Sequence, residues 1–172
     1  MKKIVLVLFS CICIVTFVLF IYFNFFYASH TFDSCVEKYA KEYNLETEFV
    51  YAIIKAESDF REDAVSRSGA LGLMQIIPST AKWIAGEFNE KYEKEKLLTA
   101  ETNIKYGCFY LNYLFSKFKN QDVVICAYNA GETVVRKWLD ENDELDEDKI
   151  EYEETRVYLE RVRKFYKMFK SW

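Results

Sequence analysis

The sequence has few residues that interrupt helices. It contains one proline and five glycines among 172 residues. Proline and glycine are the strongest local breakers of helices and the commonest markers of turns. Their scarcity makes helix the default structure along the chain. It favours an all-α fold with at most one small β-hairpin.

Histidine is also scarce. The single histidine, His30, has no potential ligand beside it, and none of the cysteine spacings is typical of a metal site. We therefore expect neither a metal nor another cofactor. Cys108 and Cys126 lie in apolar helical patterns, which favours buried free thiols. Cys35 is the remaining cysteine after the N-terminal segment. A single disulfide among the three is possible, and their spacing does not assign it.

An excess of positive charge is missing from most of the chain. Residues 31–172 hold 21 of the 23 Lys and Arg and all 27 Asp and Glu, so their net charge is −6. Contacts to nucleic-acid phosphates need a basic surface. We therefore expect no nucleic-acid partner.

One long apolar run stands at the N-terminus. Residues 4–27, "IVLVLFSCICIVTFVLFIYFNFFY", carry no charge, and about 20 apolar residues suffice to span a bilayer. A cleavable signal has a shorter apolar region and a small-residue cleavage site, which "FYASH" matches poorly. The run predicts an uncleaved transmembrane signal anchor. Lys2 and Lys3 favour a cytoplasmic N-terminus.

The anchor implies two parts. Residues 1–30 would hold the cytoplasmic tip and the transmembrane segment, and residues 31–172 one domain outside the membrane. Apolar residues at three- and four-residue intervals predict helices in that domain. The predicted helices cover about 31–43, 47–60, 78–86, 102–118, 121–130, 132–139 and 153–170. Thr47 is the expected N-cap of the second, and Pro78 lies in the first turn of the third.

Two segments are predicted to be loops. The stretch 61–77 holds Gly69 and Gly72 and favours a loop with a short hairpin. Residues 140–154 contain ten acidic side chains and are typical of a solvated loop. A calcium-binding loop needs a glycine at its sixth position, and this segment has none.

Glu57 raises the question of chemistry. It follows Ile53 by four residues and Ile54 by three, so all three lie on one helix face. A carboxyl group on an apolar face is either at the rim, with its head in water, or desolvated with a raised pKa suited to a general acid. Periodicity alone favours the first alternative, in which the Glu57 carboxyl lies at the rim of the face and reaches water.

Three other segments are weak signals when taken singly. "GLMQ" places Gln75 after a glycine turn, and Met74 there is by default a core residue. "AYNAG" places Tyr128 and Asn129 at the end of a buried helix. "ETRVY" places Glu154 and Tyr158 on one helix face.

Together and in this order, the motifs resemble those of the soluble-lytic-transglycosylase family. The matching stretches are "ES" at 57–58, "S…GALGLMQIIPSTA" at 66–81, "AYNAG" at 127–131 and "ETRVYLERV" at 154–162. The resemblance covers about 33–169. It implies a lysozyme-like domain related to goose-type lysozyme, which cleaves the β-1,4 bond between N-acetylmuramic acid and N-acetylglucosamine in peptidoglycan.

The resemblance also implies roles for individual residues. Glu57 corresponds to the catalytic acid and base. The substrate-binding positions are Ser66, Gln75, Tyr128, Asn129 and Tyr158, and the supporting positions are Ser58, Met74 and Glu154. Ile77 departs from the methionine of many relatives, which is a conservative apolar change.

A lone carboxylate is consistent with this chemistry. Most glycosidases use two carboxylates, but family members use the muramic acid's own 6-hydroxyl as nucleophile and form a 1,6-anhydro ring. Two alternatives stay open: a muramidase that uses water with a second carboxylate, for which the acidic segment 140–154 is a source, and an inactive wall-binding or scaffold module. The expected partners are glycan strands and, through residues 4–27, the cytoplasmic membrane, with the domain facing the cell wall. No feature identifies a protein partner.

Overall fold

The computed structural model describes residues 9–20 and 31–171. The chain divides into two compact units, Met1–Asp33 and Ser34–Trp172. In the first unit, residues 9–20 form a helix with exposed side chains. No helix within the described ranges is both long enough and apolar enough to cross a membrane. The predicted span, 4–27, extends beyond the described part on both sides and stays a prediction.

The elements of the second unit are all helices joined by loops, which confirms the all-α prediction for the described residues. Its helices are α2 (Asp33–Glu42), α3 (Thr47–Glu57), α4 (Pro78–Glu87), α5 (Ala100–Lys117), α6 (Gln121–Ala130), α7 (Glu132–Val135) and α8 (Glu153–Phe169). Short 3-10 turns cover Lys94–Leu98, Arg136–Trp138 and Glu147–Lys149. The expected hairpin over 61–77 is reduced to two isolated bridges, Val65 to Leu71 and Leu71 to Ile76.

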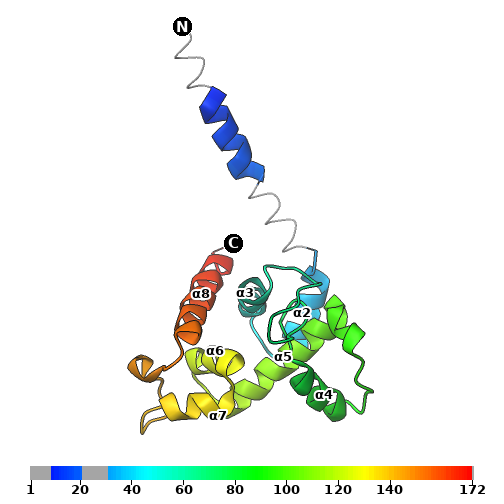
Figure 1. Cartoon of the computed structure of the whole chain (residues 1–172), viewed down its shortest axis with the longest axis vertical. Coiled ribbons are helices and arrows are strands. Elements are labelled where there is room, and N and C mark those ends of the chain that lie inside the picture. Colours follow the sequence, from blue (N-terminus) through cyan, green and yellow to red (C-terminus); the bar gives the residue numbers. More distant parts are fainter. Residues whose placement is uncertain (1–8, 21–30, 172) are drawn as a thin grey trace. The chain divides into compact units, whose positions relative to one another are not determined.

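Helix α6 forms the centre of the unit. It packs against α5 on one side and α8 on another (Figure 1). Five consecutive residues of α6, Val123 to Ala127, are buried, as their continuous apolar sequence predicts. Both thiols predicted to be buried, Cys108 on α5 and Cys126 on α6, are buried and unpaired.

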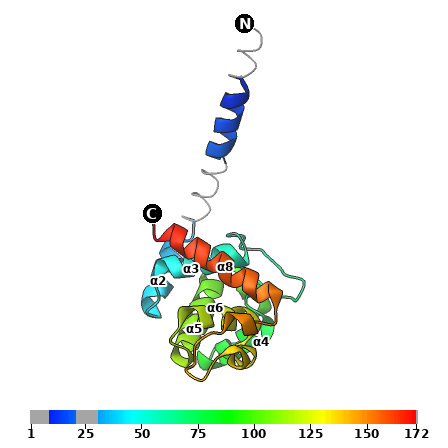
Figure 2. The ribbon, with the colours of Figure 1, turned by 90° about the vertical axis from the view of Figure 1, so that its left-hand side faces the viewer.

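Helices α3 and α8 pack along each other (Figure 1, Figure 2). The Phe49 ring of α3 lies edge-on to the rings of Tyr166 of α8 and Phe115 of α5, with 5.7 Å between the ring centres in both pairs. This packing brings the C-terminal end of α3, where Glu57 lies, near the beginning of α8. Two segments far apart in the sequence therefore meet.

The ends of α3 differ from the prediction. Glu46 is the N-cap, Thr47 is the first helical residue, and no side chain caps the helix there. The helix ends at Glu57 instead of Phe60, because Asp59 and Phe60 adopt positive φ angles of 56° and 61°, which are incompatible with a right-handed helix. Glu57 is therefore a helix-terminal residue.

Two other boundaries follow their expected chemistry. Pro78 occupies the first turn of α4, where its missing N–H breaks no hydrogen bond. Gly131 ends α6 with φ at 90°, a backbone conformation that residues with a Cβ rarely adopt.

Candidate active site

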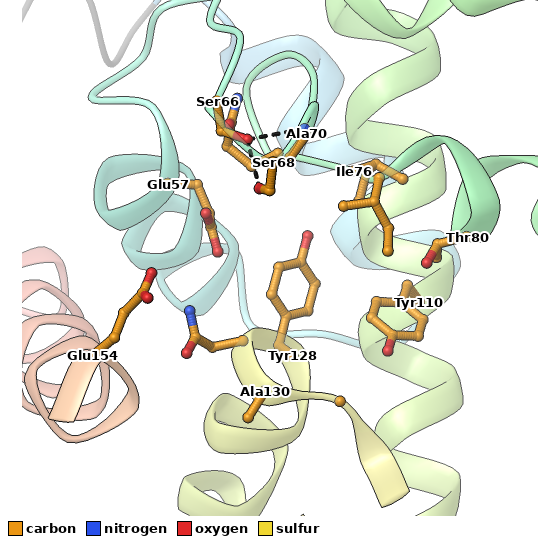
Figure 3. Close-up of a pocket in the computed structure, with 14 residues that line it drawn as sticks. Glu57, Ser66, Ser68, Ala70, Ile76, Thr80, Tyr110, Tyr128, Ala130 and Glu154 are labelled. Atoms are coloured by element: carbon orange, nitrogen blue, oxygen red, sulfur yellow. Dashed lines mark hydrogen bonds between the residues drawn. The ribbon is translucent and has the colours of Figure 1, made fainter. Parts of the chain in front are cut away.

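Glu57 lies in a pocket of about 340 Å³ that α3, the loop before α4, α5, the end of α6 and the start of α8 surround. In Figure 3, Glu57 and Glu154 lie on one side, Thr80 and Tyr110 on the other, and Tyr128 between them. We call this cavity the Glu57 pocket. Its lining comprises Glu57, Ser66, Ser68, Ala70, Gln75, Ile76, Ile77, Thr80, Tyr110, Tyr128, Asn129, Ala130, Gly131 and Glu154.

The Glu57 carboxyl is a weaker acid than an ordinary glutamate. Burial among apolar groups raises its pKa from 4.5 to about 7, because desolvation disfavours the charged form. The Tyr158 hydroxyl and Arg161 act in the opposite direction, and the negative charge of Glu154 adds to the increase. The outcome is a carboxyl group that holds its proton near neutral pH, as a general acid must.

Tyr158 of α8 acts on the pKa of Glu57 and is almost completely buried. Within the described residues its hydroxyl has no hydrogen-bond partner at ordinary distance. Its effect on the pKa of Glu57 is therefore that of a longer, weaker hydrogen-bonding interaction.

Tyr128 is fixed by a different bond. Its hydroxyl donates to the Met74 carbonyl oxygen at 2.7 Å, which joins α6 to the "GLMQ" turn. Met74 is fully buried. A Cβ placed on Gly107 of α5 would lie only 2.2 Å from the Met74 sulfur. Met74 and Gly107 thus form a close contact beneath the pocket.

The turn that carries Met74 is held by Asn103, a fully buried side chain of α5. Its Oδ1 accepts from the Met74 N–H at 2.6 Å, and its Nδ2 donates to the Leu71 and Leu97 carbonyls at 2.8 and 2.7 Å. Gly72, at φ 76°, has no room for a side chain, because a Cβ would lie 2.2 Å from the Asn103 amide nitrogen. One amide therefore anchors the whole turn.

Gln75 follows that turn with a positive φ of 48°, an uncommon conformation for a residue with a side chain. Its Nε2 donates to the Ala64 carbonyl at 3.1 Å and to the Gly72 carbonyl at 2.8 Å. Both amide hydrogens are thus used to close the loop. The side-chain oxygen is the group left for a ligand in the pocket.

Ser66 and Ser68 form the upper wall in Figure 3. The Ser66 hydroxyl accepts from the Ala70 N–H at 2.9 Å and lies 2.9 Å from the Ser68 hydroxyl. Ser58, by contrast, is buried outside the pocket lining, and its hydroxyl donates to the Ile54 carbonyl at 3.2 Å. Ser58 is the C-cap of α3, and its supporting role stays a prediction.

Asn129 and Glu154 complete the pocket near α8. The Asn129 Oδ1 accepts from the Thr155 hydroxyl at 2.8 Å, so its amide nitrogen is the remaining polar group. Glu154 is exposed and makes no hydrogen bond to any described residue. Its carboxylate lines the pocket, and its predicted supporting role stays a prediction.

The structure brings together most of the predicted site residues. Glu57, Ser66, Gln75, Tyr128, Asn129 and Glu154 line the pocket, whereas Ser58, Met74 and Tyr158 lie outside its lining. Sequence reasoning missed Thr80, Tyr110 and Asn103. Asn103 had one available signal, since it is a polar residue next to Ile104 in the apolar stripe of its helix. In the described ranges, no cluster of His, Cys, Asp and Glu is suited to a metal ion.

Solved structures with the same fold are lytic transglycosylases. An inactive mutant of the lytic transglycosylase Slt from Pseudomonas aeruginosa superposes with a TM-score of 0.74 and 32% identity, covering 81% of this chain and 24% of that one. The 70 kDa soluble lytic transglycosylase from Escherichia coli has a TM-score of 0.74 and 30% identity over the same shares. The helical unit thus has the fold of one part of these larger enzymes.

Sequence comparison gives the family. Residues 34–151 match the Transglycosylase SLT domain. A putative soluble lytic murein transglycosylase from Haemophilus influenzae is 39% identical over 126 residues, which are 69% of this chain and 21% of that protein. The membrane-bound lytic murein transglycosylase C from Haemophilus ducreyi is 33% identical over 120 residues, 61% of this chain and 32% of that protein. The chain belongs to the transglycosylase SLT domain family, which confirms the prediction from its motifs.

Proposed function

We propose that this chain is a lytic transglycosylase that cleaves the β-1,4 bond after N-acetylmuramic acid in peptidoglycan glycan strands, with Glu57 as its acid and base. The observation that carries the proposal is the Glu57 carboxyl itself. It lies in an open pocket beside polar groups, and its pKa of about 7 keeps a proton available at neutral pH.

The relatives support this substrate. Those compared above are named lytic murein transglycosylases, and one solved structure is a complex of the 70 kDa enzyme with bulgecin A. The chain spans 21% to 32% of the length of these curated relatives, so only one part of them is shared. The mutant from P. aeruginosa carries glutamine in place of a glutamate and is inactive.

The proposed reaction needs one carboxyl group. Glu57 gives its proton to the glycosidic oxygen as the bond from the anomeric carbon breaks, which releases the next sugar as an alcohol. The resulting carboxylate then takes the proton of the muramic acid's 6-hydroxyl, whose oxygen bonds to the same anomeric carbon and closes the 1,6-anhydro ring. The protein ends in its starting state. Intramolecular attack gains from a high effective concentration.

The surrounding groups suit this sequence of steps. The Tyr158 hydroxyl can donate to the carboxylate while Glu57 is ionised and relax when the proton returns. The Gln75 oxygen and the Asn129 amide nitrogen offer one acceptor and one donor to the sugar. Ser66 lies on the wall above them.

A hydrolytic muramidase is the second candidate, and one observation favours it. Glu154 lines the same pocket, and its charge acts on the pKa of Glu57. Hydrolytic glycosidases usually act through two carboxylates that lie in one pocket. Glu154 would then be the base that activates a water molecule, and the product would have a reducing end.

We further propose that residues 4–27 anchor the enzyme in the cytoplasmic membrane, with the N-terminus inside and the helical unit facing the wall. The uncharged run and the two preceding lysines support this topology. One relative is named as membrane-bound and another as soluble, so the relatives agree with either location.

Purified peptidoglycan digested by the unmodified chain and by Glu57→Gln tests both candidates. We expect Glu57→Gln to lose activity by roughly 10²–10⁴-fold, the range for removal of a general acid. Mass spectrometry of the products separates anhydro ends, which mean a transglycosylase, from reducing ends, which mean a muramidase.

A matched control is Glu37→Gln. Glu37 is an exposed glutamate of α2 outside the pocket, and its replacement should leave the activity unchanged. Full activity of Glu57→Gln would refute the assignment of the acid. No activity of the unmodified chain on any glycan would favour the inactive binding module.

A further inference from the structure

The charges of the helical unit are unevenly distributed, and the second half of α8 holds an excess of cations. Residues 161–170 contain five Lys and Arg and no Asp or Glu. The remainder of residues 31–172 contains 16 Lys and Arg and 27 Asp and Glu, so its net charge is −11. One short segment of an acidic unit is therefore positively charged, and such a segment attracts anions.

Three of these cations lie on the face of α8 that points away from the rest of the unit. The buried face of the helix includes Tyr158 and Val162. Arg161, Lys164 and Lys167 follow one another at three-residue intervals on the opposite face, and all three are exposed. Figure 2 shows α8 at the front of the unit, with no other helix before it. We call Arg161, Lys164 and Lys167 the basic face of α8.

The cations of the basic face are not neutralised by acids of the unit. None of the three forms an ion pair with a described residue, whereas Arg163 and Lys170 of the same helix are both paired with acids. The one acid of α8 on this side, Glu160, comes before Arg161, and no acid follows it up to Lys170. The basic face therefore has charge available for a partner.

The anchor proposed above would keep this face close to a membrane. Five residues, 28–32, separate the proposed span 4–27 from Asp33, the first residue of α2. Five extended residues reach at most about 18 Å. In both Figure 1 and Figure 2, α8 ends at the end of the helical unit where α2 begins. The basic face therefore belongs to the part of the unit that the anchor would hold nearest the bilayer.

The shape of the basic face suits a layer of anions better than one small anion. Its cations extend over about 9 Å of a convex helix surface, and none of them lines the Glu57 pocket. A small ligand needs a concave site, whereas lipid headgroups present many phosphates side by side. Each Lys or Arg beside an anionic membrane strengthens binding about five-fold. The anchor adds a high effective concentration, so a weak contact suffices.

We propose that the basic face of α8 binds the anionic lipid headgroups of the membrane in which the chain is anchored, and so holds the helical unit against the bilayer surface. This inference rests on the proposed anchor, because the anchor is what brings the face to a membrane. The contact is electrostatic. Salt should weaken it, since exposed charges are screened beyond about 8 Å at physiological ionic strength.

Lysine acylation of the full chain in lipid nanodiscs tests the proposal. One set of discs contains phosphatidylcholine alone, and the other contains the anionic lipid phosphatidylglycerol as well. Mass spectrometry gives the reaction rate of each lysine with a neutral acylating reagent. Lys164 and Lys167 should react about three- to seven-fold more slowly in the anionic discs, because a negative surface potential favours the unreactive ammonium form. Lys82 and Lys94, which are exposed on α4 and on the 3-10 turn after it, should react equally in both.

Lys164→Glu and Lys94→Glu form a matched pair of variants, since each changes the charge of an exposed site by two units. Lys164→Glu should weaken the contact about thirty-fold and return Lys167 to its rate in neutral discs. Lys94→Glu should leave Lys167 slowed. Arg161 is kept, because it also acts on the pKa of Glu57. Equal rates of Lys164 and Lys167 in both kinds of disc would overturn the proposal, and so would an equal effect of the two variants.

Two further measurements separate the basic face from the anchor and from other anions. Retention of the chain by neutral discs at high salt reports on the anchor alone. A chain that those discs release would refute the anchor, whereas a retained chain with unslowed lysines refutes only the membrane contact. Soluble polyphosphate added to neutral discs represents an anionic polymer. Slowing of Lys164 and Lys167 by polyphosphate but not by anionic discs would overturn the choice of a membrane as the partner.

Discussion

At the scale of single residues, Glu57 shows how one pKa results from opposing neighbours. Desolvation has the largest effect and raises it, the Tyr158 hydroxyl and Arg161 lower it, and Glu154 raises it. Tyr128 cannot assist in the same way as Tyr158, because its hydroxyl already donates to the Met74 carbonyl. The two tyrosines near the carboxyl group therefore have different roles, one in its acidity and one in the backbone beneath it.

The pH dependence of activity should reveal these neighbours separately. If protonated Glu57 is the acid, kcat/KM should fall as the pH rises through about 7. Glu154→Gln removes a negative charge and should move this fall to lower pH. Tyr158→Phe removes a hydroxyl that favours the carboxylate and should move it to higher pH. Rate profiles on soluble glycan between pH 5 and pH 9 would measure both shifts, and shifts in the same direction would contradict the description of the pocket.

The same carboxyl group should make stability depend on pH. Its pKa in the folded chain, about 7, lies above the ordinary value of 4.5, so the folded state holds the proton more tightly. This stabilisation is complete below about pH 4.5 and is lost as the pH rises through 7. Relative to Glu57→Gln, the unmodified chain should lose on the order of 2 kcal/mol between these limits. Urea denaturation at pH 5 and pH 8 measures it, and a constant difference would argue against a desolvated Glu57.

At the scale of elements, the contact between α5 and the "GLMQ" turn depends on a missing side chain. A Cβ at Gly107 would lie 2.2 Å from the Met74 sulfur and 2.9 Å from the Met74 Cβ. Met74 has little freedom to move, since its N–H is bonded to Asn103 and its carbonyl to Tyr128. The turn and the helix therefore fit each other only with glycine at this position.

Gly107→Ala should therefore destabilise the fold by about 1–3 kcal/mol, the usual cost of overpacking. Gly86→Ala is the matched helix glycine, because a Cβ there meets no atom within 4 Å. It should stabilise α4 by about 0.5–1 kcal/mol, since alanine loses less backbone entropy. Thermal or urea denaturation compares the two, and equal effects would show that the Met74 contact is unimportant.

Helix periodicity explains why much of the fold was predictable. The stripes of α5 and α8 and the apolar run of α6 identify these helices and their buried faces. Local signals at Pro78 and Gly131 place two helix boundaries correctly. The premature end of α3 was not predictable, because nothing in the sequence near Asp59 and Phe60 indicates positive φ angles.

The site was predictable only where a motif marked it. Tyr110 and Thr80 lie in the pocket because α4 and α5 pack beside α6, and no local pattern reports that packing. The approach of Glu154 to Glu57 likewise follows from the pairing of α3 with α8. Sequence spacing describes one helix at a time, whereas these relations belong to pairs of helices.

At the scale of the whole molecule, the helical unit should fold without the N-terminal segment. Ser34–Trp172 form a compact unit of their own, and every buried side chain among residues 9–20 and 31–171 belongs to it. A chain that lacks residues 1–28 should be soluble in the absence of detergent and retain activity on peptidoglycan. Sedimentation, thermal unfolding and digestion assays check this. Aggregation or loss of the cooperative transition would contradict the predicted boundary at residue 30.

The unpaired thiols of the helical unit have a consequence for the redox conditions that its fold tolerates. Burial raises the pKa of Cys108 and Cys126, and burial together with Glu101 raises that of Cys35 to about 12. Thiolates are the species that oxidise and exchange disulfides, so all three react slowly. The fold depends on no disulfide. We therefore expect the helical unit to keep its fold under reducing and oxidising conditions alike.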